Sequence, residues 1–177
     1  WGYNLEDRLP ELVAEVGDWA TTRRDFWQLV TDLFSQNFIG RINDWCVAHG
    51  LEFTGHFLGE ETLRGNVSYS GDSQQSVRLM TVPGIDWLCR VPVSNLAILQ
   101  LTSAAQQVGK KRVLCEMFGC AGWNISLEDM KWIAQWQAAF GINDQLQHLG
   151  LYSLRGSRKR EYPASILHQQ PWFTRYR

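Results

Sequence analysis

The sequence predicts an α/β protein in which parallel strands alternate with helices. Short apolar runs typical of buried strands recur along the chain, and segments with apolar residues at helical spacing separate them. This alternation indicates parallel strands joined by right-handed crossovers. With 177 residues, 45% of them hydrophobic and 20% charged, the chain has the length and composition of one globular domain, residues 1–177.

The N-terminal part predicts one dominant helix. Residues 1–22 are interpreted as an irregular lead-in, with a short helix over 11–16. Apolar residues then recur at helical spacing over 23–48, which predicts a long amphipathic helix. Gly40 is a weak point within it, and Gly50 is positioned to end it.

Two strands and a long connection follow this helix. The apolar run 51–57 predicts the first strand, and the run 83–88, with Asp86 inside it, predicts the second. Between them the stretch 58–80 is polar and glycine-bearing, so we expect a long loop there. Loops of this length often carry function.

A helix and a third strand come next. Ser94 or Asn95 can cap a helix that runs to Val108, and Gly109 ends it. The apolar run 112–118 then predicts the third strand.

The last predicted units are a capped helix, a fourth strand and a tail. The sequence SLED at 126–129 is typical of a capping box, and apolar spacing continues to residue 140 before Gly141. A fourth strand is expected within 142–152. The tail, 154–177, is basic at first and then rich in proline and aromatic residues.

Composition excludes some classes of partner. The net charge of −1 gives no support for binding nucleic acid or an anionic membrane, and no apolar run approaches the ~20 residues of a membrane helix. No signal peptide is evident, but the chain begins at Trp1, so we expect the true N-terminus to lie outside it and leave the compartment open.

The cysteines predict thiols and no metal site. All four lie in or beside apolar stretches, which indicates buried free thiols; they are Cys46, Cys89, Cys115 and Cys120. The C-x4-C spacing of the last two lacks the second pair that a zinc site needs.

Titratable side chains stand at the C-terminal ends of all four predicted strands. They are His56 with Glu60 or Glu61, then Asp86, then Glu116, and finally His148 with Tyr152. Parallel strands bring such ends to one face, so we expect a shared catalytic face. Glu116 is the strongest candidate, because a carboxylate within the apolar run VLCEMFG is costly unless it is paired or used. Two strands that deliver carboxylates to one edge supply the pair that glycoside hydrolysis requires.

Each of these residues also has a simpler interpretation. His56 could be a hydrogen-bonded core histidine, Asp86 a loop cap, and at least one of the two glutamates at 60–61 a solvent-facing charge. Most of the nine tryptophans would be core residues. The basic run 155–160 could grip phosphate or be a solvated loop.

Four segments together resemble the catalytic barrel of large bacterial glycoside hydrolases of the α-L-rhamnosidase-like and β-galactosidase-like type. They are TGHFLGEE at 54–61, VPGIDWL at 82–88, SAAQQVGKKRVLCEMFGCAGWNISLEDMKWIAQWQ at 103–137, and H-x3-YS-x-RG-x-RKR-x-YP at 148–163. The resemblance extends over nearly the whole chain, from LP-x-L at 9–12 to PWF at 171–173.

The resemblance implies a (β/α)8 barrel that hydrolyses an oligosaccharide or glycoside. Glu60, or Glu61 if the register differs by one, and Glu116 would be the acid and the base or nucleophile. Five residues would line the sugar pocket: His56, Asp86, Trp123, His148 and Tyr152. Calcium is a candidate cofactor by family analogy only, since no D-x-D-x-D-type loop argues for it.

The chain departs from this family in size. A full barrel needs eight strands and about 250 residues, and only four strands are predicted here. We therefore expect the C-terminal part of a barrel, a partial TIM barrel, that self-associates or belongs with flanking domains. Two alternatives stay open: a non-catalytic carbohydrate-binding relative, and an unrelated α/β domain that binds a phosphorylated ligand through 155–160.

Overall fold

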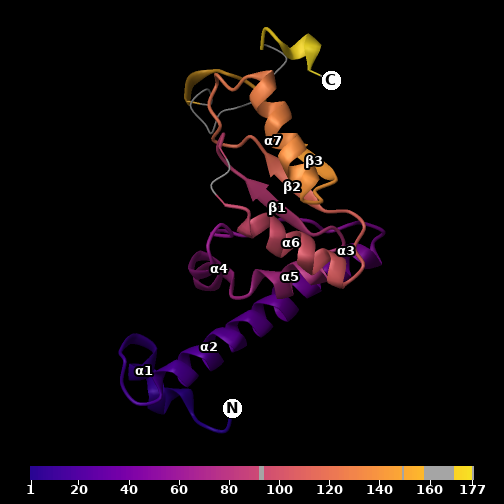
Figure 1. Ribbon diagram of the computed structural model, residues 1–177. Coiled ribbons are helices and arrows are strands. Elements are labelled where there is room, and N and C mark those ends of the chain that lie inside the picture. Colours follow the sequence, from indigo (N-terminus) through magenta and orange to yellow (C-terminus); the bar gives the residue numbers. More distant parts are fainter. Residues whose placement is uncertain (92–93, 149, 158–169, 177) are drawn as a thin grey trace.

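Figure 1 shows the computed structural model, which describes residues 1–91, 94–148, 150–157 and 170–176. The chain is a mixed helix-and-strand protein with a small parallel sheet of three strands, as the sequence predicts in this general form. In chain order the elements are η1 (Leu5–Arg8), α1 (Leu9–Val13), α2 (Trp19–Phe34), the π-helix η2 (Ser35–Gly40), α3 (Arg41–Ala48), α4 (Leu63–Ser70), α5 (Ser73–Leu79), β1 (Gly84–Trp87), α6 (Leu96–Gln107), β2 (Leu114–Met117), α7 (Leu127–Ala139), β3 (Asp144–Gln147) and η4 (Phe173–Arg175).

The sheet has the order β1-β2-β3, and both pairs are parallel. The register places Asp86 of β1 opposite Glu116 of β2. Because side chains alternate between the two faces of a strand, these two carboxylates lie on the same face. Their neighbours Ile85 and Cys115 are fully buried on the other face.

Helices α6 and α7 provide the crossovers between the strands and much of the core. α6 buries a stripe of small and branched apolar residues, including Ile98, Leu101 and Ala105, and α7 buries Met130 and Ile133. The predicted capping box of α7 is confirmed, since Ser126 and Asp129 each accept a hydrogen bond from the other's backbone N–H. The core therefore lies between the sheet and its crossover helices.

The predicted long helix over 23–48 is confirmed as a nearly continuous helical rod, α2, η2 and α3, that begins earlier, at Trp19. The weak point expected at Gly40 falls at the end of the π-helical turn. Gly50, at a φ of 70°, ends the rod: its N–H donates to Val47, while the N–H of Leu51 donates to Cys46. α2 extends away from the sheet and carries α1 at its far end (Figure 1).

Two local predictions are wrong. Residues 51–57 form no strand; they run as an irregular extended segment beside the start of β1, where the N–H of Val82 donates to the carbonyl of Phe53. The expected loop over 58–80 contains α4 and α5, whose first turns are capped by Thr62 and Asp72. Helices of eight and seven residues are too short to give a clear apolar period in the sequence.

Other boundaries shift by smaller amounts. The early helix lies at Leu9–Val13 instead of 11–16, and the fourth predicted strand is the short β3. The thiol prediction holds for Cys115, which is buried, and is wrong for Cys89 and Cys120, which are exposed. Most of the tail lies outside the described residues, including the basic run beyond Ser157. Within the described part, no helix is long and apolar enough to cross a membrane.

The segment 51–57 is held against the sheet by close backbone contact and by charge. Arg112 forms ion pairs with both Glu52 and Asp144, which ties the start of the segment to β2 and β3. At Gly84, a Cβ atom would lie 2.4 Å from the carbonyl oxygen of Gly55. A side chain at this position is therefore excluded by backbone atoms, which cannot rotate away.

We expect Gly84→Ala to lower the free energy of unfolding by about 2 kcal/mol, because the extra methyl forces the segment away from β1. Gly55→Ala is the matched control, since nothing lies within 4 Å of a Cβ built there. It should change stability by less than about 0.5 kcal/mol. Urea unfolding of both variants measures the difference, and equal stabilities would contradict the tight contact.

Candidate active site

Three chain segments meet around the imidazole ring of His56. The ring lies beside the sheet, with Nδ1 3.6 Å from Oδ2 of Asp86 and Nε2 3.2 Å from Oε2 of Glu116. Asp86 belongs to β1 and Glu116 to β2, and their register as direct partners places both carboxylates within reach of one ring. The close contact of Gly55 with Gly84 holds the preceding backbone in place.

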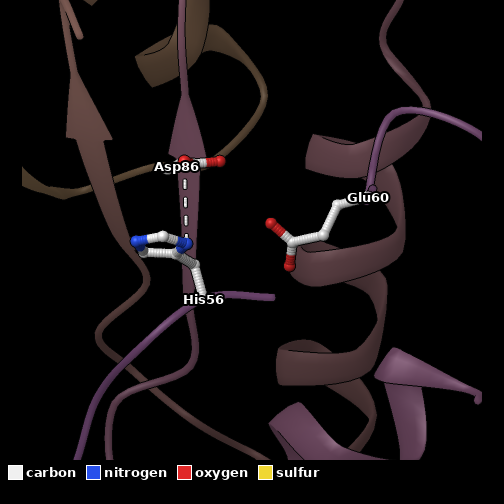
Figure 2. Close-up of side chains that lie close together, drawn as sticks. All are labelled: His56, Glu60 and Asp86. Carbon is white, nitrogen blue, oxygen red and sulfur yellow. Dashed lines mark ion pairs between the residues drawn. The ribbon is translucent and has the colours of Figure 1, made fainter. Parts of the chain in front are cut away.

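Glu60 completes the cluster from the turn that precedes α4. Figure 2 shows its carboxyl group directed toward His56 and Asp86, on the Nδ1 side of the ring. One atom each from His56, Glu60 and Asp86 lies within 4.8 Å of the others. These three residues and Glu116 follow strands in the sequence-based prediction of one shared face, and the structure brings all four together.

Two glycines allow the turn that carries Glu60 to pack closely on α4. A Cβ atom on Gly59, which has a φ of 77°, would lie 2.7 Å from the ring of Tyr69, and one on Gly65 would lie 2.6 Å from the carbonyl oxygen of Gly59. Thr62 caps the helix by accepting a hydrogen bond from the N–H of Gly65. This packing leaves Glu60 only 6% exposed.

Burial and neighbouring charge favour the neutral form of Glu60. Burial is the largest cause and raises its pKa to about 8, and the negative charges of Asp86 and Glu61 act in the same direction. A backbone hydrogen bond at Phe57 opposes the shift. Glu60 is therefore mostly protonated at neutral pH, as a group that donates a proton must be.

The pKa of Asp86 is also raised, first by burial. The charge of Glu116 adds to this effect, while a positive charge on His56 lowers the pKa of Asp86. The imidazole thus lies between two carboxylates that repel one another, where it offsets part of their repulsion.

The donor set at this cluster does not fit the calcium that the family analogy suggests. Ca²⁺ takes six to eight oxygen ligands, whereas the group of His56, Glu60 and Asp86 offers one imidazole nitrogen and two carboxyl groups, with Glu116 on the other side of the ring. One carboxylate, that of Glu60, also favours its protonated form, which does not ligate. We therefore assign none of these residues as a metal ligand.

The remaining predicted residues lie at different depths. Glu61 is exposed, although its charge still acts on Glu60 and Asp86. Trp123 is half-buried in the loop after β2. The backbone N–H of His148 donates to Met117, and its ring lies against Gly119. Tyr152 is 98% exposed, so its ring faces solvent instead of lining a pocket.

His56 is also one of the residues that line an apolar groove of about 510 Å³, whose lining does not include Glu60, Asp86 or Glu116. It runs between the segment 53–58 and the helical rod, and its walls include Phe34, Phe38 and Tyr69. Phe34 packs edge-to-face on Phe57 and stacks on Phe38. Such aromatic walls suit the apolar faces of a sugar ring.

Sequence reasoning missed two polar residues behind Glu60. Asn66 of α4 and Gln100 of α6 line a small buried cavity together with the Glu60 carboxyl group. Asn66 lies in the stretch that was expected to be a loop, so no spacing argument pointed to it. The sequence signal that could have located α4 is Thr62, a residue type that often caps a helix. In the structure Thr62 accepts a hydrogen bond from the N–H of Gly65.

The raised pKa of Glu60 has a consequence for stability. A pKa raised from 4.5 to about 8 stabilises the fold fully below pH 4.5, and this stabilisation is lost as pH rises toward 8. Glu60→Gln removes this dependence while keeping the shape. We expect the difference in unfolding free energy, variant minus wild type, to rise by several kcal/mol, up to ~4, between pH 5 and 8.

Chemical denaturation across this pH range measures that difference. Glu15→Gln is the control, because this glutamate is exposed and lies outside the site. Its difference from wild type should stay nearly flat over the same range. A flat difference for Glu60→Gln as well would show that Glu60 ionises normally in the folded protein.

Comparison with known proteins finds no relative of this chain. No family model matches the sequence, no curated protein matches it, and no solved structure matches it. The resemblance to glycoside hydrolase barrels is therefore a hypothesis, and the function has to be argued from the geometry around His56.

Proposed function

We propose that this chain is a catalytic domain of a glycoside hydrolase, with Glu60 as the general acid and Glu116 as the base or nucleophile. The observation that carries the proposal is the cluster itself: a buried glutamic acid and two strand carboxylates face one imidazole. Glycosidases of most families use two carboxyl groups, one of them protonated, and this cluster places Glu60, whose pKa is raised by burial, beside two strand carboxyl groups.

Glu116 is a better partner for Glu60 than Asp86 is. Glu60 and Asp86 offer oxygens within 4.8 Å of each other, on the Nδ1 side of His56. An inverting enzyme needs roughly 6.5–9.5 Å between its carboxyl groups to admit a water, so the Glu60–Asp86 pair is too close for that reaction. Glu116 contacts the opposite nitrogen, Nε2, whereas Glu60 lies on the Nδ1 side of the ring, so we assign the wider separation to the Glu60–Glu116 pair.

Asp86 and His56 have positioning roles in this proposal. His56 contacts both strand carboxylates, so it orients Glu116 and offsets its repulsion from Asp86. Asp86 in turn helps to keep Glu60 protonated. The apolar groove beside His56 would receive the sugar, and Trp123 offers a further aromatic surface in the loop after β2.

We also propose that the three parallel strands belong to a partial (β/α)8 barrel. The order β1-α6-β2-α7-β3 repeats the strand-helix unit of that fold, and the carboxylates lie toward the C-terminal ends of β1 and β2. Active sites of such barrels lie at this end of the strands. The substrate class is a glycoside or oligosaccharide of the α-L-rhamnoside or β-D-galactoside type.

Leaving-group dependence tests the two carboxyl roles. We expect Glu60→Gln to lose at least about 100-fold in kcat/KM on alkyl or sugar leaving groups, and to lose far less on dinitrophenyl glycosides, which need no acid. Glu116→Gln should lose activity on both kinds of substrate. In the wild type, activity should fall as pH rises through about 8, when Glu60 loses its proton.

Glu61→Gln is the matched control and should keep its activity within about twofold. Nuclear magnetic resonance of the first-formed anomer distinguishes retention from inversion. If the wild-type chain binds glycosides without hydrolysing any, and Glu116→Gln binds them equally well, the chain is a carbohydrate-binding protein instead. Salt-sensitive binding of phosphate compounds with no response to glycosides would favour the phosphorylated-ligand alternative.

A further inference from the structure

We propose that Asn66 and Gln100 bind one buried water molecule that holds the carboxyl group of Glu60 for proton transfer. The proposal rests on the proposed function, because it assigns positioning residues to the same acid. It identifies two residues, on α4 and α6, that lie behind the site and touch no substrate.

The cavity behind Glu60 has the size of a single water. Its volume is about 10 Å³, and it is lined by Glu60, Asn66, Gln100 and Ser73 among others. A water needs about this much room and two to four polar partners. Glu60 and Asn66 are 6% and 4% exposed, so bulk solvent does not supply these partners.

Three buried polar atoms, on residues that line this cavity, have no partner among the described residues. They are Oε2 of Glu60, Oδ1 of Asn66 and Nε2 of Gln100. The two amides are linked, because Nδ2 of Asn66 donates to Oε1 of Gln100 at 2.9 Å. This bond leaves one free acceptor on Asn66 and one free donor on Gln100, and an unmet buried polar atom costs about 1–3 kcal/mol.

One water satisfies all three atoms in either protonation state of Glu60. When Glu60 is protonated, the water accepts from Glu60 and from Gln100 and donates to Asn66. When Glu60 is ionised, the water rotates, still accepts from Gln100, and donates to both Asn66 and Glu60. An acid that loses and regains a proton in each cycle benefits from such a partner.

Titratable side chains also surround Glu60. The groups that face this carboxyl are His56, Asp86 and Glu61, from the segment before β1, from β1 itself and from the turn before α4. The amides on α4 and α6 are uncharged. Their removal should therefore act on Glu60 through hydrogen bonding alone.

Gln100→Leu and Asn66→Leu test the proposal, with Gln106→Leu, at an exposed position of α6, as the control. We expect both variants to lower kcat about tenfold with KM unchanged, since the acid is affected and the sugar groove is not. The conservative variants Gln100→Asn and Asn66→Ser, which keep a donor or an acceptor, should recover part of the rate. A high-resolution crystal structure of the wild type should show the water.

A readout without substrate separates this proposal from the proposed function. Carboxyl-carbon resonances of a ¹³C-glutamate-labelled chain report the titration of Glu60, assigned by its loss in Glu60→Gln. We expect the proton affinity of Glu60 to rise at least threefold in Gln100→Leu, because the ionised form loses its donor. A shift without any glycosidase activity overturns the function alone, and an unchanged titration with no ordered water overturns the water site.

A second proposal concerns the two cysteines that follow β1 and β2, and it is independent of glycoside hydrolysis. We infer that Cys89 and Cys120 form a reversible disulfide across the ends of β1 and β2. Both are exposed free thiols, and they follow the strands that carry Asp86 and Glu116.

The backbone register brings the two cysteines level. Along the ladder Trp87 pairs with Met117, so simple continuation would place Cys89 opposite Gly119. Instead the N–H of Cys89 donates to the carbonyl of Gly119 at 2.6 Å, a bond that shifts the register by one residue at Phe118, whose φ is 70°. This bond leaves Cys89 level with Cys120, and the pKa of Cys120 is raised first by burial and then by the neighbouring thiol of Cys89.

The chemistry is thiol–disulfide exchange with a small disulfide such as oxidised glutathione. One cysteine thiolate attacks the oxidant and releases one reduced thiol, and the second cysteine attacks the mixed disulfide and releases another. The chain loses two protons and two electrons, which reduce the oxidant's disulfide to two thiols. Cys115 takes no part in this exchange, because its side chain is buried and the oxidant does not reach it.

Incubation with oxidised glutathione should lower the free-thiol count by two and the mass by two hydrogens. Cys89→Ser or Cys120→Ser should each abolish this change and leave a glutathione adduct on the remaining cysteine. Cys46→Ser is the control and should still lose two thiols. Stable glutathione adducts on both cysteines of the wild type, or no loss of thiols, would overturn the proposal.

Discussion

The parallel pairing of β1 with β2 is the constraint on which this site depends. It places Asp86 directly opposite Glu116, so that two carboxylates share one face of the sheet at the spacing of neighbouring strands. Two like charges at that spacing repel, and the surrounding structure has to offset the repulsion. The His56 ring, in contact with both, provides this offset.

The two neighbouring chain segments bring an imidazole ring and a protonated carboxyl group to this pair of carboxylates. The segment before β1 reaches the sheet because Gly84 has no side chain, and it delivers His56. The turn before α4 delivers Glu60, whose carboxyl group is neutral at pH 7 as a consequence of its burial. A third ionised carboxylate at this place would be far more costly than a protonated one.

The buried glutamic acid illustrates how a site can work against the stability of its fold. Its burial stabilises the folded chain only while the proton is bound, so the fold weakens toward alkaline pH. Close glycine contacts at Gly59 and Gly65 hold the turn in place in spite of this cost. Such a balance, in which a local cost is retained at a reactive group, is common at functional sites.

The sequence by itself determined the general class and pointed to the four residues that meet at the candidate site. Apolar runs and helical spacing located three strands, the long N-terminal helix and both crossover helices, and polar interruptions of the strands pointed to Asp86 and Glu116. These elements and residues can be located from the sequence because a period of two or 3.6 residues, or a charge within an apolar run, is a property of one contiguous stretch of sequence. His56 and Glu60 followed from their place after an apolar run, although that run, residues 51–57, is not a strand.

Only the tertiary structure decided which of these groups meet and what lies behind them. α4 and α5 are too short to show a period, so no sequence pattern places Asn66 beside Glu60. The contact of Asn66 with Gln100 joins residues 34 positions apart, and the shifted register that brings Cys89 level with Cys120 depends on the backbone at Phe118. Contacts between distant segments depend on how whole elements pack, and no local pattern records that packing.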